Sequence, residues 1–253
     1  AEEGGDGELQ LAAVYTALMT QRAAAREGPE IQRADREVEH LSALAVLNQD
    51  PCLVLLGGPG SGKTTFVNFV ALCLAGAALG DPQINLGLLT TSLPQEDGPQ
   101  PWDHGALLPV QVVLRDFVAW GLPEPGTRVD SRTLWDFIVA DLGPHRDYAP
   151  HLKRELLERG GLVLLDGLDE VPEADRRRAQ VKAAVQGFVT DFPRCRYLVT
   201  SRTYAYQRQD WKLEGEFTEA VLAPFTQGQI TRFVARWYAH VGAKRGWDEA
   251  HAQ

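Results

Sequence analysis

Apolar positions along the chain form short continuous runs, separated by longer stretches in which apolar residues recur at helical spacing. The runs do not alternate with polar residues, which is typical of strands buried on both faces. Strand-like and helical patterns alternate, and this order predicts a parallel sheet flanked by helices. The predicted strands are Cys52–Leu56, Leu108–Leu114, Leu162–Leu165 and Tyr197–Thr200, with a fifth at Ala220–Leu222. The predicted helices are Thr64–Ala78, Thr133–Leu142, Leu152–Arg159 and Glu173–Phe192.

The chain on both sides of this α/β region is predicted to be helical. Before it, two sets of apolar residues have helical spacing. After it, Thr226 and Gln229 form a capping box, and the apolar residues that follow as far as His240 share one helix face. We therefore divide the chain into an N-terminal helical segment (1–50), an α/β domain (51–223) and the start of a helical domain (224–253). The N-terminal sets are Leu11, Val14, Tyr15 and Leu18, and Val38, Leu41, Leu44 and Leu47.

Residues 80–105 show no clear strand or helix pattern. They contain several prolines and glycines and show little periodicity. A loop of this length is either functional or mobile, and we favour a mobile surface insertion.

Composition and charge narrow the class of protein. The chain is 44% hydrophobic and 23% charged, which is ordinary for a globular protein. Its net charge of −9 argues against a generally basic surface, so nucleic acid is not an expected partner. The apolar runs are far shorter than the roughly 20 residues that span a bilayer, so no membrane contact is expected. The three cysteines lack CxxC spacing, which predicts buried thiols in a cytoplasmic protein, of which this chain would be one part.

A glycine-rich segment directly follows the first predicted strand and precedes a helical pattern. It matches GxxxxGK[ST], in which backbone N–H groups surround phosphates and the helix presents its positive end to them. In this pattern Lys63 neutralises the β- and γ-phosphates, and the Thr64 hydroxyl is a ligand of Mg²⁺. The agreement of motif and context argues against a turn that merely links strand to helix. The predicted nucleotide-binding residues are Gly57, Gly58, Pro59, Gly60, Ser61, Gly62, Lys63, Thr64 and Thr65.

An acidic cluster ends the predicted strand Leu162–Leu165. Asp166 stands where ligands of open α/β sheets bind, so we predict that it contacts Mg²⁺ through water. Asp169 and Glu170 follow in positions from which either could orient or deprotonate an attacking water. Their spacing does not distinguish them, and one of them could instead cap the helix that follows.

Two arginines also follow predicted strands. Arg202 is predicted to contact the γ-phosphate and to stabilise charge on the transferred group, with a structural ion pair as the alternative. For Arg115 and its neighbour Asp116 we favour a structural salt bridge over a place in the site.

Taken together, these segments resemble the NACHT branch of the STAND nucleoside triphosphatases. The resemblance rests on GGPGSGKTT, LVLLDGLDEVP, YLVTSRT and LAPFTQGQITRFV, and it spans about residues 9–240. The small residue after Asp166, followed by Leu-Asp-Glu, is the most characteristic feature. The resemblance is closest to bacterial multidomain members, and it implies a P-loop fold of the ASCE/STAND type with a five-stranded parallel sheet. It also makes Arg202 the sensor arginine of the family.

The resemblance implies an ATP-dependent molecular switch in signalling or defence, with slow hydrolysis and with ATP/ADP and Mg²⁺ as cofactors. It also implies self-association of the full-length protein and a sensed ligand that this sequence does not identify. The family's Gly-x-Pro segment and winged-helix histidine do not occur before Gln253. Ala34–Glu37 only partly resembles the family's glycine-arginine segment on the adenine side, and ATP is favoured over GTP because no NKxD signature follows the fourth strand.

Two other functions remain open from the sequence. One is a nucleotide-gated interaction scaffold with negligible turnover as a fragment. The other is a P-loop kinase for a small molecule, against which the Asp169-Glu170 pair and the helical C-terminal region argue.

Overall fold

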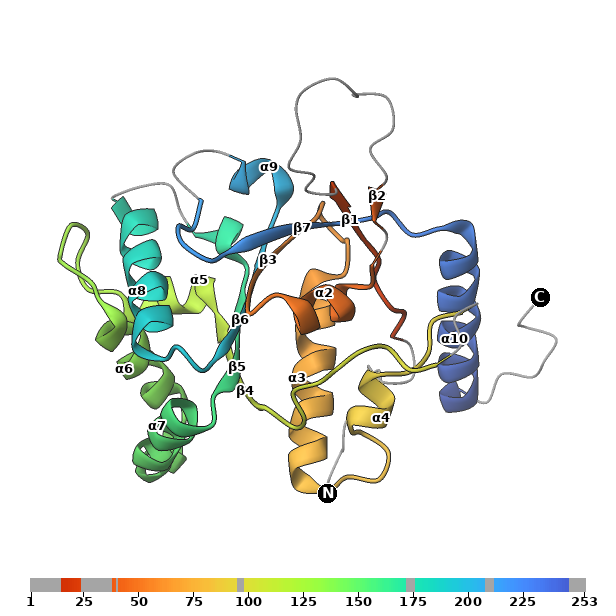
Figure 1. The fold of residues 1–253 in the computed structure, drawn as a ribbon, viewed down its shortest axis with the longest axis horizontal. Helices are drawn as coiled ribbons and strands as arrows, with labels where there is room; N and C mark the ends of the chain where they lie inside the picture. The colour runs from red at the N-terminus through yellow and green to blue at the C-terminus, as the bar shows by residue number, and fades with distance from the viewer. Residues whose placement is uncertain are drawn as a thin grey trace.

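The computed structural model describes residues 15–23, 38–39, 41–94, 98–171, 176–207 and 212–245. At its centre five parallel strands form a sheet in the order β7-β3-β6-β5-β4 (Figure 1). This confirms the predicted α/β class and all five predicted strands. Their bounds are β3 Cys52–Leu56, β4 Leu108–Val113, β5 Gly161–Asp166, β6 Arg196–Ser201 and β7 Thr218–Leu222.

Helices cover both faces of this sheet. Their bounds are α2 Ala43–Gln49, α3 Lys63–Leu79, α4 Leu86–Leu89, α5 Leu114–Asp116, α6 Ser131–Asp141, α7 Ala149–Glu158, α8 Arg177–Asp191, α9 Thr203–Tyr206 and α10 Gln227–Arg245. The short turns are a π-helix at Phe117–Gly121 and 3₁₀ turns at Gly143–Tyr148 and Leu168–Glu170.

The continuous apolar runs arise because each central strand contributes to two cores. In β3, Leu53 and Leu55 pack with α2 and α3, whereas Val54 and Leu56 face the core that contains α6, α7 and α8. All five residues of β3 are buried. A strand covered on both faces has no solvent-facing side, so alternation is lost and the run stays apolar.

The N-terminal helix prediction is confirmed at α2 (Ala43–Gln49) and is wrong for the described residues before it. Tyr15–Leu18 is not helical, and the chain continues into strand β1 (Thr20–Ala23), which pairs antiparallel with β7 at the sheet edge. A second short strand, β2 (Val38–Glu39), pairs with β1, and helix starts only at α2. Pairing with the unpaired edge of β7 outweighs a helical spacing of only four apolar residues. Leu11, Val14 and Ala34–Glu37 lie outside the described residues.

The described parts of the segment 80–105, residues 80–94 and 98–105, do not form the loose surface insertion that the composition predicts. Asp81 accepts hydrogen bonds from the next turn, and Asn85 caps α4. Leu89 and Gln100 are buried, and α4 packs against α3. Local side-chain caps order this part of the chain without a long hydrophobic period, which is why the pattern alone missed it.

Candidate functional site

The carboxyl ends of β3, β5 and β6 meet at one edge of the sheet, and a cavity of about 270 Å³ lies there. One wall is formed by residues 59–65, which comprise part of the glycine-rich loop after β3 and the first residues of α3. The opposite wall comes from the ends of β5 and β6 and the turn that follows β5. The cavity is lined by Pro59, Gly60, Ser61, Gly62, Lys63, Thr64, Thr65, Asp166, Gly167, Asp169, Glu170, Thr200 and Arg202.

The loop delivers the N-terminus of a long helix to this cavity. Helix α3 begins at Lys63, and Gly62 before it has φ 89°, a left-handed conformation that favours glycine. A Cβ at this position would also approach the side chain of Leu18 to 3.3 Å. No side chain caps the helix, so its first N–H groups and its positive end remain open to an anion.

The side chain of Lys63, the first residue of α3, contacts the loop. Its Nζ donates to the carbonyls of Gly57 at 2.9 Å and Gly58 at 3.0 Å, and lies 3.3 Å from the hydroxyl of Ser61. Burial lowers the pKa of this ammonium group, while the carboxylates of the cavity, Asp169 foremost, oppose that shift. A negatively charged ligand would therefore find a partly desolvated cation already inside the loop.

Asp166 ends β5 and is 6% exposed. The hydroxyl of Thr200 donates to its Oδ1 at 2.5 Å and accepts the N–H of Gly167 at 2.9 Å. Asp166 and Thr64 both line this cavity, and their side chains carry a carboxylate and a hydroxyl. These are hard oxygen donors, which suit Mg²⁺ when phosphates and waters complete its octahedron.

Asp169 and Glu170 have different surroundings. Asp169 accepts from the backbone N–H of Arg202 at 2.9 Å, and its Oδ2 lies 2.9 Å from the guanidinium Nε of Arg202. Its side chain is 8% exposed, whereas that of Glu170 is 45% exposed and lies 3.7 Å from Nη1 of Arg115. Asp169 is therefore engaged in the ion pair with Arg202, and Glu170 is the carboxylate that solvent can reach.

The structure brings the predicted site residues together. All of them line the cavity except Gly57 and Gly58, whose carbonyls hold Lys63. Arg115 does contact Asp116, at 3.3 Å, as expected, but it also faces Glu170. Neither Asp169 nor Glu170 caps α8, whose N-cap residue is Arg176.

Sequence reasoning missed Thr200. A signal was present, because Thr200 is a polar residue in an apolar strand, but its meaning depends on the strand register. Leu165 pairs with Val199, so the next residues, Asp166 and Thr200, stand side by side.

The fold and this geometry define the class of protein. A strand, a glycine-rich loop and a helix N-terminus stand opposite a strand-end aspartate, with a lysine and an arginine in the same cavity. This arrangement is that of a P-loop nucleoside triphosphatase domain.

The family comparison is more specific. The family model for the NACHT domain matches residues 52–241. The chain belongs to the NACHT family, and it is a nucleotide-binding module of the P-loop type. No curated protein matches the chain. Within the part of the chain that the structure describes, no helix is long and apolar enough to cross a membrane.

Proposed function

We propose that this chain binds ATP with Mg²⁺, hydrolyses it slowly, and works as the nucleotide switch of a larger signalling or defence protein. One observation carries the proposal. Lys63, Asp166, Glu170 and Arg202 come from distant parts of the sequence and line one cavity at the end of the P-loop strand. Phosphoryl transfer is catalysed almost entirely by positioning and charge stabilisation, which these groups can supply.

Each residue has a separate task in this proposal. Bound Mg²⁺, held by Thr64 and Asp166, would neutralise charge on the phosphates. Glu170 accepts a proton from the attacking water, because it is the open carboxylate. Arg202 stabilises charge on the γ-phosphate. Both cations are engaged within the protein, Lys63 by the loop carbonyls and Arg202 by Asp169, and their reorientation on binding is consistent with slow turnover.

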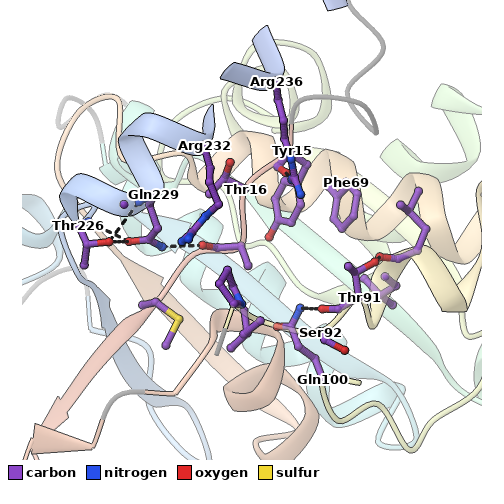
Figure 2. Close-up of a pocket in the computed structure, with 17 residues that line it drawn as sticks. Tyr15, Thr16, Phe69, Thr91, Ser92, Gln100, Thr226, Gln229, Arg232 and Arg236 are labelled. Atoms are coloured by element: carbon purple, nitrogen blue, oxygen red, sulfur yellow. Dashed lines mark hydrogen bonds between the residues drawn. The ribbon is translucent and has the colours of Figure 1, made fainter. Parts of the chain in front are cut away.

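For the base of the nucleotide we propose a second, larger cavity of about 740 Å³, lined by residues of segment 15–19, α3, α4 and α10 (Figure 2). The segment 15–19 forms one wall, and Leu18 within it packs against Gly62. The rings of Tyr15 and Phe69 stack at 3.7 Å in that wall. Phe69 lies six residues after Lys63 in α3, about 9 Å along the helix axis, and an aromatic wall at this distance suits a planar base.

The same cavity supports a link between nucleotide and α10. Gln229 donates to the carbonyl of Ala17 at 2.9 Å, and Arg236 donates to the carbonyl of Tyr15 at 2.7 Å. A ligand between segment 15–19 and α10 would change these contacts. The outer residues of α10 include Trp237, 39% exposed, and such an apolar surface is a candidate for self-association or for packing of a further domain. The cytoplasmic location, the existence of a sensed ligand and the domain boundaries at 50 and 223 remain predictions.

Single-turnover hydrolysis with saturating Mg²⁺-ATP tests the catalytic part. Glu170→Gln should bind ATP like the wild type and lose at least about 100-fold in rate, because the proton acceptor is gone. Asp191→Asn is a matched control, since Asp191 lies on α8 and contacts Ser131 instead of the cavity. Hydrolysis that persists in an Asp169→Asn/Glu170→Gln double variant would contradict the assignment of the base.

The same assay separates the alternatives. Negligible turnover by the wild type, with intact ATP binding, would favour a nucleotide-gated scaffold. Release of free phosphate without any acceptor would exclude a small-molecule kinase.

A further inference from the structure

Thr200 connects the two strands whose ends carry the acidic side of the cavity. It lies in β6 beside the end of β5 and is 1% exposed. Its hydroxyl has two partners from the neighbouring strand, the carboxylate of Asp166 and the N–H of Gly167. A buried hydroxyl with two such partners fixes both of them in place.

The direction of these hydrogen bonds follows from the number of hydrogens. A threonine hydroxyl has one hydrogen, and the N–H of Gly167 can only donate. The hydroxyl oxygen therefore accepts from Gly167, at 2.9 Å, and its single hydrogen goes to Oδ1 of Asp166, at 2.5 Å. This engages Oδ1, and Oδ2 of Asp166 has no hydrogen-bond partner among the residues that the structure describes.

The bond to Gly167 has a second effect. Gly167 begins the turn that carries the two acidic residues after β5, and the N–H of Glu170 donates to its carbonyl at 3.0 Å. Two residues after Thr200, the N–H of Arg202 donates to Asp169. Thr200 thus links the carboxylate of Asp166, the proposed metal ligand, with the start of the turn that carries Glu170.

We propose that Thr200 is a positioning residue for metal binding: its hydroxyl orients Asp166 so that one carboxylate oxygen is presented to the Mg²⁺ of the bound nucleotide. The inference rests on the proposed function. Removal of groups that orient metal ligands typically weakens metal affinity about 10- to 100-fold. A merely structural threonine would affect stability without changing the dependence on Mg²⁺.

The test is the Mg²⁺ concentration at which ATP binding and single-turnover hydrolysis reach half of their maxima. Thr200→Val removes the hydroxyl at nearly constant volume and should raise this midpoint about tenfold or more. Its ATP affinity in EDTA should stay within about twofold of the wild type, because the loop and Lys63 are unchanged. Thr200→Ser keeps the hydroxyl and should retain the wild-type midpoint.

Thr218→Val is the matched control. Thr218 lies on β7, and its hydroxyl donates to the carbonyl of Cys52 away from the cavity. A midpoint for Thr200→Val no higher than that of Thr218→Val would overturn the inference, and so would an equal shift in Thr200→Ser. If the valine variant does not fold, Thr200→Ala also removes the hydroxyl and should show the same raised midpoint, and a wild-type midpoint in this variant would overturn the inference. If the wild type itself binds no nucleotide, the proposed function fails; if it binds and only the predicted shift is missing, the role of Thr200 alone fails.

Discussion

Replacement of Asp169 by asparagine separates the two acidic residues that follow β5. In the structure Asp169 holds Arg202 with both carboxylate oxygens, one on the backbone N–H and one on the guanidinium. Asparagine keeps an acceptor for the N–H but turns its amide group, a donor, towards the guanidinium Nε, which is also a donor. The variant therefore removes the ion pair and leaves most of the local shape.

The size of the effect follows from the exposure of the two partners. A hydrogen bond between charged groups contributes about 1.5–3 kcal/mol when it is shielded from water. Here Asp169 is 8% exposed but Arg202 is 54% exposed, so solvent screening reduces the value. We expect a loss of about 1–2 kcal/mol in the free energy of unfolding, measured by urea titration without nucleotide. Asp191→Asn should lose less.

Hydrolysis gives the sharper result. If Asp169 acts by placing Arg202, Asp169→Asn slows single turnover about tenfold or more, and the double variant Asp169→Asn/Arg202→Ala is no slower than Arg202→Ala alone. If Asp169 is instead the proton acceptor, the two losses multiply. Multiplied losses, or an unfolding free energy equal to that of the control, would refute the reasoning.

Three further predictions concern single groups. Burial lowers the pKa of Lys63 in the free protein, and bound phosphates favour the charged form of its ammonium group. ATP binding should therefore take up protons, and ATP affinity should fall as pH rises through that lowered pKa. Calorimetry in buffers of different ionisation enthalpy measures both effects. The three cysteines are buried, and burial raises the pKa of Cys73 to about 12, so thiol reagents at pH 8 should label them only in denaturant. Gly160→Ala should lower the unfolding free energy by about 2–4 kcal/mol, because Gly160 has φ 83° and a Cβ would lie 2.2 Å from the carbonyl oxygen of Arg194. Gly126 has φ 85° but lies in open space, so Gly126→Ala should cost only about 1–2 kcal/mol. Equal losses in the two variants would show that the contact with Arg194 is not responsible.

The central fold and the phosphate loop could be predicted from sequence because their signals are local. Strand β3 is an unbroken apolar run, and the residues expected to bind phosphate are nine consecutive ones, from Gly57 to Thr65. The order strand, loop and helix can therefore be predicted without knowledge of contacts between distant segments. The same holds for the capping box at Thr226, where Gln229 accepts the predicted hydrogen bonds.

The parts that could not be predicted depend on contacts between distant segments. Tyr15–Leu18 has apolar spacing that fits a helix, but its conformation is set by the strand that follows it and by β7, which lies far along the chain. Asp169 and Glu170 have the same charge and adjacent positions, and only the placement of Arg202 distinguishes them. The role of Thr200 requires the register of β5 against β6.

Equilibrium binding of Mg²⁺-ATP to the wild type and to Lys63→Ala, measured by titration calorimetry, tests the central claim most directly. The ammonium group of Lys63 is held by the loop carbonyls, and the variant leaves the glycines of the loop unchanged. We predict saturable binding of one ATP per chain by the wild type and no measurable binding by the variant at the same concentrations. Equal affinity in the two proteins would contradict the claim that this loop holds the phosphates of a nucleotide.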